Sequence, residues 1–296
     1  VFAIGIVILQ VGVNPYVNAL GPARTAASRL TLTNALNSVA TVIAPVFVSF
    51  LIISGDGRSG LSDPLQVQRP FTIIAVIAVM ILAIMFFLKL PEIDSNAGEI
   101  EVKQFKYKSS AFKYPHVWLG SLAIFFYMGI EIGIPSFFAD YTRELGLDLS
   151  AAQRTDWLKY YWGGLMVGRL AGIFILRRLT ARNILALCSV GGALLVAASL
   201  VLGQSAGNVA LIFFLGTGLF HSIMWPTIYN LALEDLGPLA KVASGVISTA
   251  VIGAAILTPF MGAVQKSAGL IAAIGYLLIY YLYLIFFALK GSRIRS

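Results

Sequence analysis

Long apolar stretches separated by short polar connections make up most of this 296-residue chain. A helix that crosses the hydrocarbon core of a membrane needs about 20 predominantly apolar residues. A transmembrane β-barrel would instead show segments of about ten residues with alternating polarity. The pattern therefore predicts an all-α membrane protein. We expect nine membrane-spanning helices, at roughly 1–20, 30–54, 70–88, 116–139, 157–176, 183–203, 207–232, 242–264 and 268–289.

Composition supports the membrane interpretation. Hydrophobic residues make up 58% of the chain and charged residues only 11%, and the mean hydropathy is +0.87. A soluble domain is about 25% charged. The formal net charge of +8 does not indicate a nucleic-acid partner, because the basic residues lie between apolar stretches. One cysteine, Cys188, allows neither a disulfide framework nor a Cys/His metal cluster.

Lysine and arginine are distributed unequally between the two sets of connections. One set holds 14 of these residues and the other holds six. By the positive-inside rule the richer set is cytoplasmic, and it includes the C-terminus. We expect a multi-pass protein of a bacterial-type inner membrane. The richer set comprises 21–29, 89–115, 177–182, 233–241 and 290–296.

The longest polar stretch predicts the domain organisation. We expect residues 1–90 to be three helices of an N-terminal bundle, 91–114 a cytoplasmic linker and 115–296 a C-terminal six-helix bundle. NPYVNALGP at 14–22 and WPTIYNLALEDLGP at 225–238 form a weak repeat, with a proline inside a span and then Leu-Gly-Pro. Repeated bundles are typical of secondary transporters. Two six-helix halves would need three further helices, so we expect the chain to be truncated at its N-terminus.

Two neighbouring spans carry polar stripes. Gln10, Asn14 and Asn18 are spaced by four residues and share one helix face. Buried amides are costly unless they are paired. They either bond across helices as packing contacts or line a polar cavity, where paired donors and acceptors suit sugar hydroxyls. We favour a cavity with Gln10, Asn14, Asn34 and Asn37 as sugar contacts.

Three ionisable residues lie inside spans. Glu131 is a candidate proton site, with a structural pair to His221 or Arg169 as the alternative. His221 can titrate near neutral pH or serve as a packing residue. Arg169 either snorkels to the membrane surface or braces a gate. We expect all three to act in proton coupling or gating.

Two tryptophans and one proline add to the candidate site. Trp162 and Trp225 are candidates for stacking on a sugar ring, with packing or interface anchoring as the alternative. Pro226 predicts a kink in the span 207–232, because proline removes a backbone hydrogen bond.

Several motifs are absent from the sequence. It contains no G-x-x-x-x-G-K-[ST] loop, H-E-x-x-H or G-x-S-x-G motif. We therefore expect no cofactor, no metal and no enzyme activity, and a membrane-embedded enzyme is disfavoured. A transporter of a drug or organic anion, or a sugar uniporter, stays open.

One stretch resembles a known family. NPYVNALGPARTAASRLTLTNALNSVATVIAP at 14–45 resembles the signature around the fourth and fifth helices of the fucose/galactose/glucose:proton symporters, in the major facilitator superfamily. Residues 125–141, 168–179 and 221–237 are similar to that family's seventh, eighth and tenth helices. The resemblance implies twelve helices in two bundles, alternating access to a central sugar site and proton-driven uptake. We expect a hexose or related sugar as substrate and a monomeric protein.

The resemblance also suggests roles for single residues. Asn37 matches an asparagine that faces the sugar, and Asn34 falls where family members carry an amide. Glu131 matches the acidic residue of the seventh helix. Gln10 falls where the fucose-transporting members carry a glutamate implicated in proton handling. Because glutamine cannot titrate, coupling through another acid and uniport both stay open.

Overall fold

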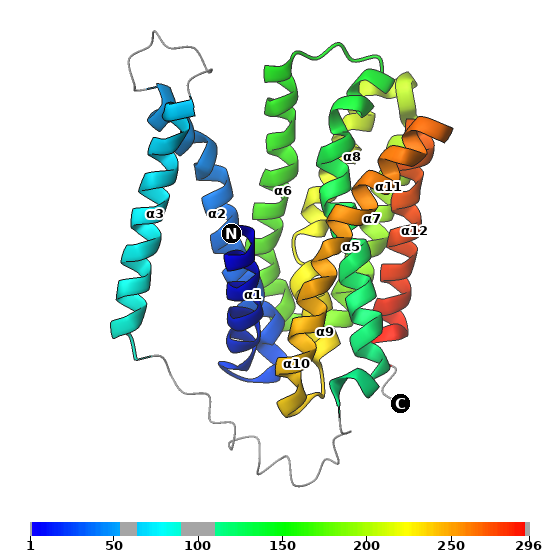
Figure 1. Ribbon diagram of the computed structural model, residues 1–296. Helices are drawn as coiled ribbons and strands as arrows, with labels where there is room; N and C mark the ends of the chain where they lie inside the picture. The colour runs from blue at the N-terminus through cyan, green and yellow to red at the C-terminus, as the bar shows by residue number, and fades with distance from the viewer. Residues whose placement is uncertain (1, 54–63, 90–109, 294–296) are drawn as a thin grey trace. The chain divides into compact units, whose positions relative to one another are not determined.

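The structure, a computed structural model, describes residues 2–53, 64–89 and 110–293 (Figure 1). Within these ranges the regular structure is helical, which confirms the all-α prediction. The first helices are α1 (Phe2–Ala19), the 3-10 helix η1 (Ala23–Thr25), α2 (Ala26–Ile53) and α3 (Pro64–Phe87). The later α-helices are α5 (Pro115–Glu144), α6 (Ala151–Arg178), α7 (Ala181–Leu202), α8 (Gly207–His221), α9 (Met224–Leu233), α10 (Ala240–Thr249), α11 (Gly253–Ala268) and α12 (Leu270–Leu289).

Each predicted span overlaps one of these helices or two in succession. Four helical segments of the described ranges are long and apolar enough to cross a membrane. The number of crossings in the whole chain stays a prediction. The four segments are Pro115–Glu144, Ala181–Leu233, Gly237–Ala268 and Leu270–Arg293.

Two predicted spans are interrupted. The span 207–232 breaks between α8 and α9, at Ser222 and Ile223. Pro226 follows within the first turn of α9 and has no amide hydrogen for the carbonyl of Ser222, which accounts for the predicted kink. The span 242–264 is also not one continuous α-helix, because the 3-10 helix η5 (Ala250–Ile252) separates α10 from α11.

The chain forms two compact units, Val1–Ala35 with Ser95–Ser296, and Leu36–Asp94. The second unit contains the later part of α2 and all of α3. Large apolar side chains of α3 are exposed, up to 86% for Phe86, as expected of a helix that faces lipid. The predicted bundle boundaries stay a prediction, and most of the linker 91–114 lies outside the described residues.

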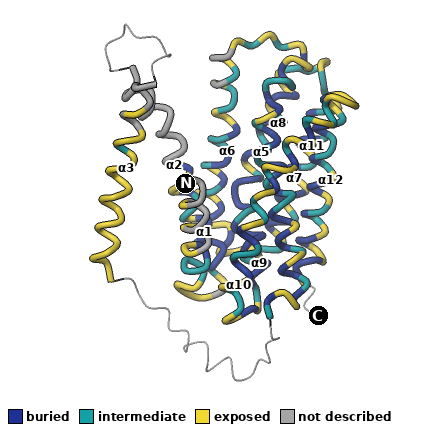
Figure 2. The backbone as a smooth tube through the Cα atoms, viewed as in Figure 1, coloured by how far each residue is buried: buried dark blue, intermediate teal, exposed yellow. Residues whose placement is uncertain are grey.

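In the first unit, α5, α7, α8 and α12 form the core. Helix α12 packs against α5 and α7, and α8 packs against α6 and α7. Figure 2 shows that buried residues concentrate where these helices face one another. Large apolar side chains also cover the outer faces, for example Val201, which is 87% exposed. A bundle that is apolar inside and outside is suited to lipid as its solvent.

Glycines spaced by four residues bring α6 close to α8. A Cβ added at Gly168 would lie 2.6 Å from the carbonyl oxygen of Leu219, and one at Gly172 would lie 2.2 Å from the Ile223 side chain. On the facing helix, a Cβ at Gly218 would lie 2.3 Å from the carbonyl oxygen of Tyr161. Small residues at this spacing allow membrane helices to pack closely. The approach places the polar residues of α6 next to the break between α8 and α9.

Candidate functional site

A largely buried ion pair joins α5 to α6. Arg169 Nη2 lies 3.6 Å from Glu131 Oε1, and the two side chains are 16% and 12% exposed. Removing charges from water is costly, so such a pair persists only where the opposite charge and further hydrogen bonds compensate it. The structural alternative for Glu131 was a pair with His221 or Arg169, and the pair forms with Arg169, while a proton role for Glu131 stays a prediction.

Arg169 also binds two backbone carbonyls. Its Nε donates to the carbonyl oxygen of Ser222 and its Nη1 to that of Asn34, each at 3.3 Å. The Ser222 carbonyl is the one that Pro226 leaves without an α-helical donor. One side chain therefore connects the Glu131 carboxylate, the start of α2 and the break between α8 and α9.

A second proline frees a second carbonyl in the same region. Pro135 lies inside α5 and leaves the carbonyl of Glu131 without its α-helical donor. The Tyr161 hydroxyl of α6 donates to this oxygen at 2.9 Å. Tyr161 and Arg169 are eight residues apart and share one face of α6. This face therefore supplies the donors for both proline-freed carbonyls.

His221 is fully buried at the end of α8, and both of its ring nitrogens are engaged. Its Nδ1 lies 2.9 Å from the Tyr161 hydroxyl, and its Nε2 bonds the Tyr281 hydroxyl of α12. Its backbone oxygen accepts a hydrogen bond from the Tyr127 hydroxyl at 3.0 Å. A neutral imidazole has one donor and one acceptor, so one tyrosine donates to the ring and the other accepts from it. Any proton movement through His221 must reorganise these bonds.

The predicted aromatic residues lie beside this network. Trp162 is half-buried and meets Tyr161 edge-on, with ring centroids 5.2 Å apart. Trp225 is half-buried and stacks on Tyr229 at 5.0 Å. Both tryptophans thus make packing contacts, and their stacking on a sugar stays a prediction.

The predicted amide residues are less closely grouped. Asn14 is buried on α1, and Asn34 Nδ2 donates to the Leu30 carbonyl of its own helix at 2.9 Å. Asn37 is exposed and follows Asn34 by one turn of α2, and its contact with a sugar stays a prediction. The side chain of Gln10 lies outside the described residues.

Three tyrosines of the network are absent from the residues predicted from the sequence: Tyr127, Tyr161 and Tyr281. A tyrosine within an apolar span has the same pattern whether it packs or binds, so spacing alone does not identify it. Pro135 is the one sequence feature that points to such a residue. It leaves the Glu131 carbonyl without its α-helical donor, so a side chain from another helix is needed to bind this oxygen.

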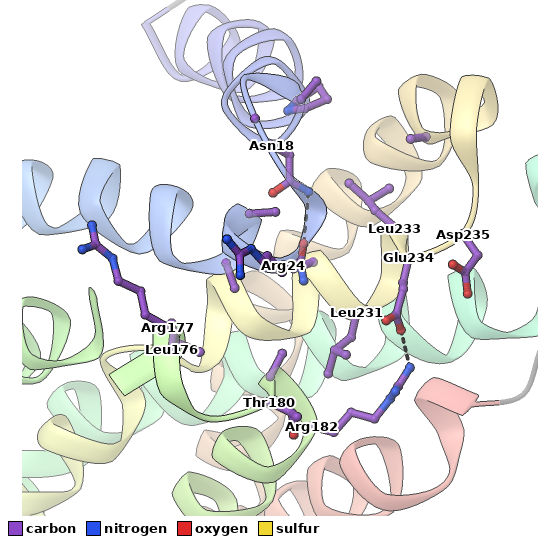
Figure 3. Close-up of a pocket in the computed structure, with 18 of the residues that line it drawn as sticks. Asn18, Arg24, Leu176, Arg177, Thr180, Arg182, Leu231, Leu233, Glu234 and Asp235 are labelled. Carbon is purple, nitrogen blue, oxygen red and sulfur yellow. Dashed lines mark hydrogen bonds and ion pairs between the residues drawn. The ribbon is translucent and has the colours of Figure 1, made fainter. Parts of the chain in front are cut away.

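A pocket of about 860 Å³ lies away from this network (Figure 3). Its wall combines the end of α1 and η1, the connection from α6 to α7, and the segment that follows α9. Asn18 Nδ2 of α1 lies 3.5 Å from Asn230 Oδ1 of α9 across it. None of the predicted sugar or proton residues lines the pocket.

Acidic, histidine and cysteine side chains do not cluster as a metal site in the part of the chain that the structure describes. The polar side chains of the site are amides, hydroxyls, the imidazole of His221, the carboxylate of Glu131 and the guanidinium of Arg169.

Comparisons with known proteins agree with this description. Residues 1–259 match the model of the Major Facilitator Superfamily. The chain is 38% identical to the putative glucose/galactose transporter of Helicobacter pylori, over 99% of this chain and 72% of the relative. It is 36% identical to the glucose/galactose transporter of Brucella abortus, over 99% of this chain and 70% of the relative.

A more distant relative has a solved structure. The chain is 28% identical to the L-fucose-proton symporter of Escherichia coli, over 91% of this chain and 65% of that protein. A crystal structure of the major facilitator transporter FucP in the outward conformation superimposes with a TM-score of 0.81 at 27% identity. That match covers 95% of this chain and 72% of the solved chain.

Proposed function

The chain belongs to the major facilitator superfamily, and we propose that it is a secondary transporter that carries a hexose together with a proton. Relatives named glucose/galactose transporters support the choice of substrate. A relative named as a fucose-proton symporter supports the coupling ion. The protein is an integral membrane transporter and not an enzyme. Its predicted setting is a bacterial-type inner membrane, with the C-terminus in the cytoplasm.

The observation that carries the proposal is the buried ion pair of Glu131 with Arg169. Glu131 is the proton carrier in this account. A proton on Glu131 removes the negative charge that faces Arg169. The ion pair is then lost, and only hydrogen bonds hold the guanidinium against the carbonyls of Asn34 and Ser222. Protonation is thereby linked to the contact between the start of α2 and the break that follows α8. Transport requires such contacts to form and separate in alternation.

The sugar contacts in this account are Gln10, Asn14, Asn34 and Asn37, with Trp162 and Trp225 as stacking partners. Support comes from the burial of Asn14 and from the position of Asn34, whose carbonyl binds Arg169. A sugar that displaces the amide of Asn34 from Leu30 alters the same segment of α2 that Arg169 binds. Sugar and proton are thus coupled through one turn of helix.

The test is uptake by the purified protein in proteoliposomes. An inwardly directed proton gradient is imposed across the membrane, and labelled glucose, galactose, fucose and mannose are supplied with and without an uncoupler. Concentrative uptake of a hexose that the uncoupler abolishes is the expected result. Uptake that equilibrates and ignores the uncoupler would identify a uniporter, with Gln10 as the physical reason. A correctly inserted protein that moves none of the four sugars would contradict the substrate class.

A further inference from the structure

His221 lies at the centre of a buried group of tyrosine rings. Its imidazole stacks on the ring of Tyr281, with centroids 5.8 Å apart. It meets the rings of Tyr161 and Tyr127 edge-on, at 5.8 Å and 6.3 Å. These three rings come from α12, α6 and α5, and His221 itself is 0% exposed at the end of α8. A titratable side chain is therefore enclosed where these helices meet, and its protonation state determines what it can do.

The imidazole is neutral in these surroundings. In the part of the chain that the structure describes, none of the ion pairs includes His221, and the acid of the network, Glu131, is paired with Arg169. The groups that bind its ring nitrogens are two hydroxyls, those of Tyr161 and Tyr281. An imidazolium here would be a buried charge without an opposite charge beside it, which is strongly unfavourable. One ring nitrogen therefore carries a proton, and the other accepts a hydrogen bond.

The carbonyl of Glu131 decides which nitrogen carries the proton. Pro135 has no amide hydrogen for this oxygen, and the Tyr161 hydroxyl donates to it at 2.9 Å. A hydroxyl has one hydrogen to donate. Because Tyr161 uses this hydrogen on Glu131, its oxygen can only accept from His221 Nδ1, which lies 2.9 Å away. The imidazole proton is then on Nδ1.

The other ring nitrogen becomes the acceptor. With Nδ1 protonated, Nε2 has a free lone pair, so the Tyr281 hydroxyl is the donor in the bond between them. Donation thus runs in one direction, from α12 through α8 and α6 to the Glu131 carbonyl of α5. The opposite direction would leave this buried carbonyl without a donor, which is costly.

His221 also binds α5 through its backbone. Its carbonyl oxygen accepts a hydrogen bond from the Tyr127 hydroxyl at 3.0 Å, and Tyr127 lies one helical turn before Glu131. The next residue, Ser222, supplies one of the carbonyls that bind Arg169. The end of α8 therefore holds both the turn of α5 that carries Glu131 and the guanidinium that faces its carboxylate.

We propose that His221 is a positioning residue for proton coupling, a neutral Nδ1–H imidazole that holds Tyr161 against the Glu131 carbonyl and carries no proton itself. This inference rests on the proposed proton-coupled transport, in which Glu131 is the titrating group. The carboxylate can meet Arg169 in a fixed geometry only if its own helical turn is held, and Pro135 removes one backbone bond from that turn. The hydrogen-bond chain through His221 replaces this bond.

The first arm of the test is NMR of the ¹⁵N-histidine-labelled protein in lipid bilayers. The chain has two histidines, His116 and His221, and the signals lost in His221→Asn belong to His221. The ring-nitrogen resonances distinguish the two neutral tautomers from the imidazolium. Tyr281→Phe removes the donor to Nε2. Tyr280→Phe is the matched control on the same helix, because the Tyr280 hydroxyl has no hydrogen-bond partner among the described residues.

We expect a single neutral species of His221 at neutral pH, with the proton on Nδ1. Its Nε2 resonance should move in Tyr281→Phe and keep its position in Tyr280→Phe. A proton on Nε2, or on both nitrogens, would overturn the proposal. Equal displacement of the Nε2 resonance in the two tyrosine variants, or no displacement in either, would overturn it as well.

The second arm measures sugar uptake driven by an imposed proton gradient in proteoliposomes. Asparagine places an amide donor near the position of Nδ1 and cannot titrate, so His221→Asn can still donate to Tyr161. We expect this variant to accumulate sugar more slowly than the unchanged protein does. His221→Leu has no donor, and its uptake should be at least about tenfold slower than that of His221→Asn.

The two arms separate this inference from the proposed function. Accumulation lost equally in His221→Asn and His221→Leu, with both proteins correctly inserted, would make the imidazole a proton carrier and overturn the proposal. Absence of accumulation by the unchanged protein would contradict the proposed function, and the NMR arm would then decide the hydrogen-bond chain by itself.

Discussion

The guanidinium of Arg169 lies 3.6 Å from the carboxylate of Glu131, inside a helical bundle whose outer surface is apolar. The same guanidinium donates to two backbone carbonyls. One of them, that of Ser222, accepts no α-helical hydrogen bond because Pro226 lacks an amide hydrogen. The pair is therefore part of the helix-break geometry, and a change in the charge of Glu131 acts directly on that geometry.

Replacing the carboxyl group of Glu131 should separate binding from energy coupling. In Glu131→Gln the side chain keeps its shape but cannot carry a proton. We expect this variant to exchange sugar across the membrane in counterflow while accumulating it only to the equilibrium level. Glu144→Gln, at the exposed end of the same helix, is the control and should accumulate sugar as the unchanged protein does. Normal accumulation by Glu131→Gln would remove Glu131 from the coupling mechanism.

Arg169 and Glu131 should show strong energetic coupling. Removing one partner of a buried ion pair costs about 3–5 kcal/mol, because the other charge stays buried without compensation. We expect Arg169→Gln to lower the unfolding temperature more than Glu131→Gln/Arg169→Gln does. Thermal unfolding of the purified proteins, followed by tryptophan fluorescence, measures this difference. Additive effects of the two substitutions would mean that the pair contributes nothing as a pair.

Tyr161 should stabilise the fold through its hydroxyl group. Tyr161→Phe leaves the Glu131 carbonyl without this donor and removes the partner of His221 Nδ1. A buried polar group without a partner costs about 1–3 kcal/mol, so we expect a clear loss of thermal stability. The adjacent Tyr160 is 67% exposed, and Tyr160→Phe should have no effect. Equal stability of the two variants would contradict the role assigned to the Tyr161 hydroxyl.

The close approach of α6 to α8 should tolerate no added side chain at Gly168. A methyl group there meets the carbonyl of Leu219, which is backbone and cannot swing away, whereas Gly163 of the same helix has open space around its Cβ position. We expect Gly168→Ala to lower the free energy of unfolding by about 1–3 kcal/mol, as at other overpacked sites, and to reduce transport. Gly163→Ala should change neither quantity. Folded yield and uptake compare the two variants. Parity between them would show that the helices are less closely packed than described.

The helical class and the kink near Pro226 follow from the sequence, because span length and proline chemistry are local properties. For the partner of Glu131 the sequence indicates both His221 and Arg169. These residues lie on different helices, and spacing along the chain does not determine how one helix is rotated against another. The contact of Glu131 with Arg169 depends on the close packing of α6 at Gly168. Glycines spaced by four residues indicate that α6 packs closely against another helix, but the spacing does not show which helix this is.

The tyrosines of the network were not predictable for a related reason. Tyr161 and Tyr281 lie in apolar spans, where aromatic side chains most often serve packing. Their function as hydrogen-bond partners of His221 arises only when α6, α8 and α12 meet.

The coupling of sugar to protons is the central claim, and sugar-induced proton movement measures it most directly. Proteoliposomes are placed in a weakly buffered, oxygen-free medium without a membrane potential, and the external pH is recorded as galactose or glucose is added. We predict a rise in external pH with the unchanged protein, abolished in Glu131→Gln and by an uncoupler. Sugar entry without any change in external pH would contradict symport and leave a uniporter.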